Sequence, residues 1–270
     1  MAYIEFNEFN EFLRDFGYDT GIEVIEEDDE AELERKAAIS PKDYVVTPED
    51  YFMGVPTMLN NEKAALATCA KLMKDCAKKK MSKWKDNDFG SRDEDDTDGF
   101  GASCIYPGGV IPSPGYIEPK DIAWVWGEDR CGPNEQCKFI KGGAAAADCI
   151  QGDIGDCWFI SALSVCANKD ELIVGGLPGI DPVEGMIVDN TFANECSKGI
   201  FAPIFHKYRA KGIYCLRFFK NFNWVYCIVD ERFPCKKGTK DLCFGHTPDA
   251  DEMWVQLIEK GYAKVHGNYG

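Results

Sequence analysis

The chain has 270 residues, of which 45% are apolar, and its 46 acidic and 30 basic residues give a net charge of -16. This length and apolar fraction allow one large domain or two small ones, each with a core of its own. The strong negative charge argues against binding to nucleic acid or to an anionic membrane surface.

The N-terminal sequence and the cysteine content predict the cellular compartment of the protein. The first residues, MAYIEFNEFNEFL, lack the basic start and apolar stretch of a signal peptide, and no apolar run reaches membrane-spanning length. The thirteen cysteines are odd in number and include no CxxC pair. We interpret them as reduced thiols, mostly in the core, rather than as a disulfide framework or a zinc site. We therefore predict a cytoplasmic protein with no membrane span.

Residues 1–58 are interpreted as an acidic and aromatic extension before the main domain. Residues 3–16 carry large apolar side chains at the spacing of one helical face: Phe6, Phe9, Phe12, Leu13 and Phe16. Such a stripe is usually core or a docking face. A hydrophilic run, residues 26–36, follows the stripe, and this favours the docking face over the core. That run is expected to be a solvated helix or linker.

Residues 60–98 predict a helix followed by an acidic loop. Asn60 can cap a helix over residues 62–80. Its inner face would carry Leu66, Cys69, Leu72, Met73 and Cys76. Residues 86–98, DNDFGSRDEDDTD, have the charge of a calcium loop but lack its glycine and glutamate spacing, so calcium is not expected there. Residues 106–115 are rich in proline and glycine and predict an irregular connection.

The most informative segment is residues 151–159, QGDIGDCWF, which contains a candidate nucleophile, Cys157. Gly155 allows a tight turn, Asp156 can cap a helix, and the apolar run after Cys157 continues as that helix. A thiol in the first turn of a helix is favoured as a thiolate by the helix dipole. The amide of Gln151 could donate a hydrogen bond to a developing oxyanion. Most cysteines are packing residues, so a cysteine alone would not predict catalysis.

The C-terminal part predicts a hairpin and a final helix. Residues 175–197 are rich in glycine and proline and are expected to loop out at the surface. Residues 212–219 and 223–230 alternate and are rich in aromatic and β-branched side chains, which predicts an antiparallel hairpin turning at residues 220–222. A helix over about residues 251–266 closes the chain, capped early by acidic residues.

Residues 151–159 resemble the active-site signature of calpains, the intracellular cysteine proteases of papain-like fold. The resemblance implies that Cys157 is the catalytic nucleophile and that Gln151 donates to the oxyanion. Other segments also resemble the family, namely WVYCIVDERFP (its strand pair before an acidic turn), DEMWVQLIEKGYAKVHGNY (the helix that follows), residues 63–89 and residues 116–129.

The fold that this resemblance implies is α+β. Residues 59–270 would form the first, nucleophile-bearing lobe of a calpain protease core, and residues 1–58 an N-terminal extension with no counterpart in the family.

The resemblance also implies a calcium site. Asp148 and Glu252 occupy the positions of the family's acidic ligands, and Gly143 and Lys141 those of its backbone carbonyl ligands. Hard oxygen ligands of this kind suit calcium. Ala146 stands where the family usually has an arginine that bridges to the other lobe, which leaves inter-lobe coupling in doubt. In the simpler alternative, the aspartate caps a turn and the glutamate is a helix N-terminal acid.

The histidine and asparagine of the calpain active site are expected to be missing. The chain has three histidines, His206, His246 and His266, and none lies in the family's histidine motif. Thiol catalysis of peptide hydrolysis needs a base to take the thiol proton and return it to the leaving amine. We therefore expect these 270 residues to hold the nucleophile lobe and to need a second lobe, in cis or in trans.

Two functions follow from these observations. The leading one is an intracellular, calcium-dependent cysteine endopeptidase that acts on protein substrates, with this chain as its nucleophile lobe. The alternative is a non-catalytic, calpain-like structural or docking protein, for instance on a scaffold in a cytoskeletal assembly.

Overall fold

The computed structural model describes residues 56–92, 99–131, 137–175, 199–220 and 223–270. These residues belong to the unit that spans residues 46–270. The predicted aromatic stripe, the hydrophilic run after it and most of the predicted surface insert lie outside the described residues. Within the described ranges, no helix is both long and apolar enough to cross a membrane.

The main sheet is antiparallel, with strand order β1-β4-β3. Strands β3 (Tyr214–Lys220) and β4 (Asn223–Val229) pair along their whole length, which confirms the predicted hairpin. The short β1 (Met58–Leu59) pairs with β4, so residue 58 belongs to the same sheet as the hairpin. The boundary between residues 58 and 59 stays a prediction.

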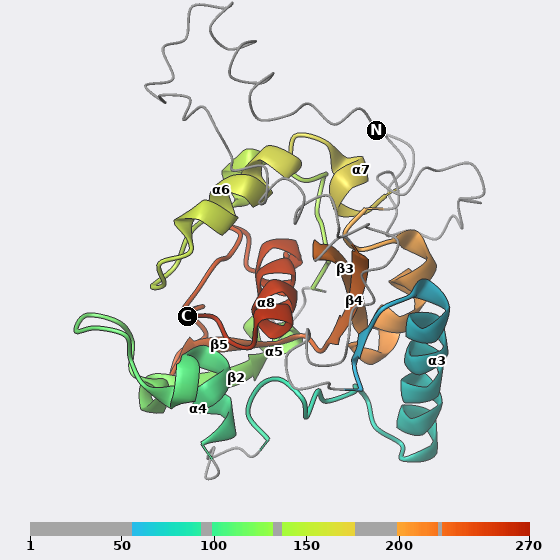
Figure 1. Cartoon of the computed structure of the whole chain (residues 1–270), viewed down its shortest axis with the longest axis horizontal. Coiled ribbons are helices and arrows are strands. Elements are labelled where there is room, and N and C mark those ends of the chain that lie inside the picture. Colours follow the sequence, from blue (N-terminus) through green and yellow to red (C-terminus); the bar gives the residue numbers. More distant parts are fainter. Residues whose placement is uncertain (1–55, 93–98, 132–136, 176–198, 221–222) are drawn as a thin grey trace, which may run out of the picture. The chain divides into compact units, whose positions relative to one another are not determined.

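Helices cover both faces of the hairpin. β4 is buried continuously from Val225 to Val229, as a strand is when both its faces are covered. Figure 1 shows α3 (Glu62–Lys78) and α8 (Trp254–His266) on either side of β3 and β4. The mixture of helices and antiparallel sheet confirms the α+β class.

Helix α3 forms where the apolar spacing predicted a helix, with small differences at its ends. Asn61, not Asn60, is the N-cap, and its side chain accepts a hydrogen bond of 2.8 Å from the Ala64 backbone N–H. The preceding asparagine instead binds the Asn61 side chain. The helix ends at Lys78, and the predicted inner face packs on the core, with Cys69 and Cys76 fully buried.

Helix α8 begins three residues later than predicted and has no acidic cap. Its N-cap position is Met253, which makes no side-chain hydrogen bond to the helix. The acids just before it are used elsewhere: Glu252 accepts from the Lys141 backbone N–H, and Asp251 pairs with the Lys141 ammonium. α8 is buried around nearly its whole circumference, and its two buried lysines, Lys260 and Lys264, are fully enclosed.

These two lysines belong to a buried network of charged groups. Lys264 Nζ lies 2.7 Å from Asp86, and Lys260 Nζ lies 2.5 Å from Asp230. Arg232 Nε also binds Asp230, at 2.7 Å. Sequence reasoning grouped Asp86 with an acidic loop, but the structure buries its side chain completely. Buried charges are tolerated when they are paired and hydrogen-bonded, and this network meets both conditions.

The structure also contains a second sheet, which has two strands. β2 (Ile122–Trp126) pairs antiparallel with β5 (Arg232–Lys236). The connection between residues 99 and 131 also holds four short helical turns: α4 (Phe100–Ile105), η3 (Pro107–Gly109), η4 (Pro119–Asp121) and α5 (Gly127–Arg130).

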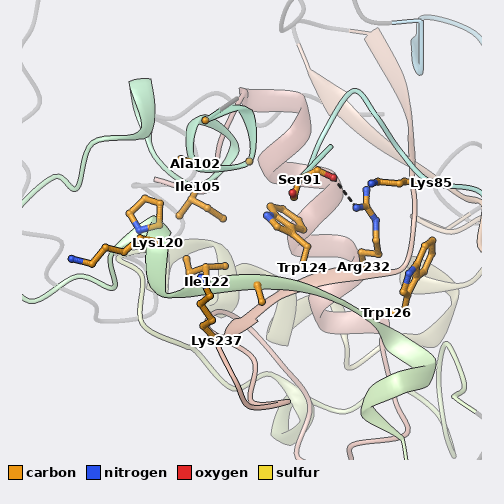
Figure 2. A pocket seen from close by; sticks show the side chains of 14 residues that line it. Lys85, Ser91, Ala102, Ile105, Lys120, Ile122, Trp124, Trp126, Arg232 and Lys237 are labelled. Carbon is orange, nitrogen blue, oxygen red and sulfur yellow. Dashed lines mark hydrogen bonds between the residues drawn. The ribbon is translucent and has the colours of Figure 1, made fainter. Parts of the chain in front are cut away.

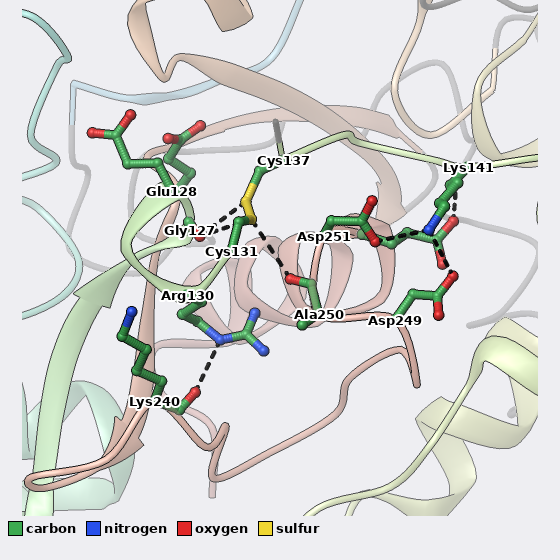
Figure 3. The surroundings of a disulfide bond; sticks show 12 residues. Gly127, Glu128, Arg130, Cys131, Cys137, Lys141, Lys240, Asp249, Ala250 and Asp251 are labelled. Atoms are coloured by element: carbon green, nitrogen blue, oxygen red, sulfur yellow. Dashed lines mark hydrogen bonds and ion pairs between the residues drawn. A yellow bond between two sulfur atoms is a disulfide. The ribbon is translucent and has the colours of Figure 1, made fainter. Parts of the chain in front are cut away.

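A disulfide joins Cys131 and Cys137, whose Cα atoms are 6.1 Å apart (Figure 3). The prediction that all the cysteines are reduced thiols is therefore wrong for this pair. The first cysteine directly follows residue 130, and the second directly precedes Lys138, whose N–H donates to the Asp251 carbonyl. Counting cysteines cannot detect such a pair, because pairing depends on the distance and orientation of the two side chains in the fold and not on the number of thiols.

Candidate functional site

The candidate nucleophile lies at the first residue of a helix, as predicted. Helix α6 spans Cys157–Cys166, and the backbone N–H of Phe159 donates to the Asp156 carbonyl at 2.8 Å, closing its first turn. The Cys157 thiol is free and exposed. A thiol in this position has the positive end of the helix dipole beside it.

The loop before α6 is held by a close approach to residues 243–246. Ile150 and His246 exchange backbone hydrogen bonds of 3.0 and 2.9 Å, and the Asp153 N–H donates to the Cys243 carbonyl at 2.7 Å. A Cβ atom on Gly152 would overlap that carbonyl, so only glycine allows this approach. The residue that lets the loop pack is therefore Gly152, whereas sequence reasoning had pointed to a tight turn at Gly155.

Asp156 does not cap the helix with its side chain. No hydrogen bond joins its carboxyl to the first turn of α6. The carboxyl instead contacts that of Glu259 on α8, and burial raises the pKa of both groups. The predicted cap is wrong because the aspartate side chain turns inward to the neighbouring helix.

Gln151 lies exposed in the loop before the nucleophile. Its side-chain amide donates a hydrogen bond of 2.6 Å to the Ile154 carbonyl. This bond fixes the orientation of the amide and leaves its second N–H available. The role of Gln151 as an oxyanion donor stays a prediction.

The four predicted calcium ligands lie on one loop and on the start of α8. The Lys138 N–H donates to the Asp251 carbonyl at 2.7 Å, and the Lys141 N–H donates to Glu252 Oε1 at 2.7 Å. Asp148 ends the turn η5 (Ala146–Asp148) and accepts from the Ala145 N–H at 2.8 Å. Asp148 therefore caps a turn, as the simpler alternative expected, whereas Glu252 precedes the N-cap of α8 and is not an acid of the first helical turn.

The charge around Glu252 is nevertheless unbalanced. The pKa of this carboxyl is raised to about 7, mainly by burial and also by the nearby Asp148, Asp249 and Asp251, against the lowering effect of the Lys141 N–H. The Lys141 ammonium neutralises part of this charge, at 3.3 Å from Asp249 and 3.1 Å from Asp251.

The side chains of these residues could hold a hard cation only together with backbone carbonyl oxygens. In the described part of the chain, no three acidic, histidine or cysteine side chains gather closely enough to hold a metal by themselves. An ion here would therefore depend on backbone carbonyl oxygens as well, such as those of Lys141 and Gly143. Gly143 has a left-handed backbone, with φ of 97°, which suits a loop that turns its carbonyls to one side.

Each histidine ring has a nitrogen beside a backbone carbonyl. His206 contacts Phe201 at 2.9 Å, His246 contacts Phe244 at 2.8 Å, and His266 contacts Tyr262 at 3.0 Å. Sequence reasoning missed that His246 pairs through its backbone with the residue just before Gln151. Only long-range chain pairing brings these two segments together, and no sequence signal announces it.

A cavity of about 530 Å³ lies beside β2, and none of the predicted site residues lines it (Figure 2). Trp124 and Trp126 of β2 contribute to its wall, with Lys85, Lys120, Lys237 and Arg232. The arginine is already bound to Asp230 and to two backbone carbonyls. Lys120 is paired with Glu118 at 2.5 Å. The cavity is therefore separate from the candidate nucleophile.

The comparisons with known proteins agree with this geometry. A family model described as "Calpain family cysteine protease" matches residues 110–270. The calpain-2 catalytic subunit of Gallus gallus is 32% identical over 159 residues, which is 58% of this chain and 18% of that protein. Calpain-8 of Rattus norvegicus is 33% identical over 156 residues, which is again 58% of this chain and 18% of that protein.

The match covers most of the chain but little of its relatives. The chain spans less than a fifth of the length of these curated relatives. The family match begins at residue 110, so the resemblance of residues 59–109 stays a prediction. Because the matched part contains QGDIGDCWF and more than half of the chain, the chain belongs to the calpain family of cysteine proteases.

Proposed function

We propose that this chain supplies the nucleophile lobe of a calpain-type cysteine endopeptidase that cleaves peptide bonds in proteins, with Cys157 as the nucleophile. One observation carries the proposal: an exposed, free thiol at the first residue of a helix, within the sequence QGDIGDCWF. The proposed location is the cytoplasm, which is supported by the ten free thiols among the described residues.

The proposed chemistry is acyl transfer through a thioester. The Cys157 thiolate attacks the peptide carbonyl, and the amide of Gln151 donates to the oxyanion that forms. The departing amine needs a proton, which an imidazole of the second lobe would deliver after taking it from the thiol. Cleavage therefore needs a histidine-bearing lobe, in cis or in trans.

The exposed side of α6 supports docking of that second lobe. Trp158 and Val165 are 59% and 70% exposed, although both are large and apolar. They stand seven residues apart on α6, which places them two turns apart on one side of the helix. An apolar strip that begins beside the nucleophile is where a second lobe would complete the site.

Calcium is proposed as the regulatory cation, held by Asp148, Glu252 and the carbonyl groups of Gly143 and Lys141. The excess of negative charge around the buried glutamate supports this proposal. A bound ion would neutralise that charge and fix the loop against the start of α8. Ala146 stands in the same loop, so coupling of the ion to a second lobe would need a group other than an arginine at this position.

Cys157 is expected to react with iodoacetamide faster than every other described cysteine. It is exposed, whereas Cys166 at the other end of the same helix is half-buried and at the negative end of the dipole. Brief alkylation followed by peptide mapping measures both rates in one sample, so the second cysteine is the internal control. Equal labelling of the two thiols would contradict the proposed nucleophile.

Calcium is expected to raise the melting temperature of the chain, because an ion that binds only the folded state stabilises it. The double change Asp148→Asn and Glu252→Gln should abolish this rise. Since the pKa of Glu252 is raised to about 7, protons compete with the ion. The rise should therefore be larger at about pH 8 than at about pH 6.

Thermal unfolding with and without calcium tests this. The matched control is Asp153→Asn, which removes an exposed acid paired with Lys236. A double variant that still responds like the wild type would place the ion elsewhere.

A further inference from the structure

Two buried carboxyl groups lie close together near the proposed nucleophile, one on the residue before it and one on α8. Asp156 immediately precedes Cys157, and its carboxyl lies close enough to that of Glu259 on α8 for each to affect the pKa of the other. Glu259 is 4% exposed, and its Oε1 also accepts the Gly245 backbone N–H at 2.8 Å. A Cβ atom on Gly245 would lie 2.7 Å from that oxygen, so the backbone of this loop presses against the carboxyl.

The pair cannot carry two negative charges in this arrangement. A carboxylate only accepts hydrogen bonds, so two carboxyls bond to each other only when one of them carries a proton. Burial raises the pKa of both groups, and each carboxyl then acts on the other. Asp156 Oδ1 is also buried with no hydrogen-bond partner, and the one backbone donor that acts on this carboxyl is its own N–H.

The surroundings offer no cation that replaces the proton. The α8 lysines that flank this turn point to Asp86 and Asp230. Tyr269, in the C-terminal segment, is near enough that Glu259 raises its pKa, after the larger effect of burial. Gly245 contributes a neutral N–H, and the neighbouring His246 ring contacts the Phe244 carbonyl. In the described part of the chain, no lysine or arginine is among the groups that act most strongly on either carboxyl.

We propose that Asp156 and Glu259 share one proton, and that the hydrogen bond it forms positions Cys157 by fixing the first turn of α6 against α8. Asp156 is a positioning residue in two ways. Its side chain holds the proton-dependent contact, and its backbone carbonyl accepts from Phe159 at 2.8 Å and from Ile160 at 3.1 Å, which starts the helix. A displaced Asp156 therefore moves the turn that carries the thiol. This role rests on the proposed function of Cys157 as the nucleophile.

The sign of the pH dependence follows from the raised pKa of Glu259. The folded chain binds a proton that the unfolded chain has already lost at neutral pH. The contact is therefore complete at low pH and weakens as the pH rises through the value of the folded pair. Loss of the proton leaves two adjacent negative charges, which repel each other and loosen the contact that fixes the first turn of α6.

Carbon-13 NMR of the labelled carboxyl groups tests the shared proton. At about pH 7, where an ordinary aspartate and glutamate are ionised, the pair is expected to retain one proton. The change Asp156→Asn should lower the pKa of Glu259, because an amide then donates to its charged form. Two fully ionised carboxyls in the wild type at this pH would overturn the proposal.

Alkylation of Cys157 tests the positioning role. Glu259→Gln keeps one negative charge and one hydrogen bond in the pair, because its amide can donate to Asp156 while its oxygen still accepts from Gly245. We expect this variant to react like the wild type at neutral pH, and its rate to increase by a larger factor than the wild-type rate as the pH rises through the value of the folded pair. Glu259→Leu removes the bond and should slow Cys157 by about two- to fivefold, the range that a helix terminus gives to a nearby charge.

The outcomes distinguish the positioning role of the carboxyl pair from the proposed role of Cys157 as the nucleophile. Melting temperature and circular dichroism establish whether each variant is folded, and Glu259→Gln keeps the test valid if the leucine variant does not fold. Equal rates and equal pH profiles in the wild type and both variants would contradict the positioning role. A wild type in which Cys157 reacts no faster than Cys166, but in which the pair retains its proton, would contradict the nucleophile alone.

Discussion

Replacing Lys264 by methionine is expected to lower the free energy of unfolding by about 3–5 kcal/mol, the usual cost of removing one partner from a buried ion pair. The ammonium is fully buried on α8, 2.7 Å from Asp86 Oδ2. It also donates to Thr57 Oγ1 at 2.6 Å and to the Ile228 carbonyl at 2.8 Å. The substitution would leave a carboxylate without its countercharge in the core, and Thr57 Oγ1 and the Ile228 carbonyl would each lose one hydrogen bond.

Urea unfolding measures this loss, and two further variants show its cause. Lys74→Met changes an exposed lysine on α3 and should alter stability by less than about 0.5 kcal/mol. The double change Asp86→Asn and Lys264→Met removes both charges and should recover part of the loss, because no unpaired charge remains. A loss below about 1 kcal/mol in the single variant would contradict the buried pair.

Residues 1–270 alone are expected to hydrolyse peptides at least about 100-fold more slowly than the same chain combined with a histidine-bearing calpain lobe. A free thiol with a pKa of about 8.5 is only slightly ionised at neutral pH, and a helix terminus corrects this only in part. A thiolate without an acid cannot protonate the departing amine, and general acid–base catalysis typically contributes about 10²–10⁴-fold. Half of the substrate cleft would be missing as well, which costs orientation.

A fluorogenic peptide measures this rate with and without the second lobe. Cys157→Ser should remove the activity of the combination, and Cys166→Ser, nine residues along the same helix, is the matched control. Turnover by the single chain that Cys157→Ser abolishes would mean that His206, His246 or His266 serves as the base. Replacing each histidine in turn by glutamine would then identify it.

The local elements could be predicted from sequence because neighbouring residues determine them. The hairpin of β3 and β4 follows from alternation, and the start of α6 at Cys157 follows from the apolar run after QGDIGD. The inner face of α3 follows from the spacing of its apolar side chains. The family resemblance needed no structure either, because a nine-residue signature is specific in itself.

The caps could not be predicted, because several residues at each helix start had the right chemistry. Asn60 and Asn61 are both suitable N-caps, and only the geometry of the turn selects the second. Asp156 also has a capping side chain, yet it turns to Glu259, more than a hundred residues away in the sequence. A propensity describes what a side chain can do locally, and a distant partner decides what it does.

The sequence by itself determined the family, the nucleophile candidate and the order of the central elements. Only the tertiary structure decided which charged residues are buried and what each of them contacts. Asp86 belongs to an acidic run in the sequence but pairs with Lys264 in the core, and Glu252 precedes a helix but binds the loop at Lys141. The physical reason is that the pKa and the energy of a charge depend on its burial and its partners, which the fold brings together from distant parts of the chain.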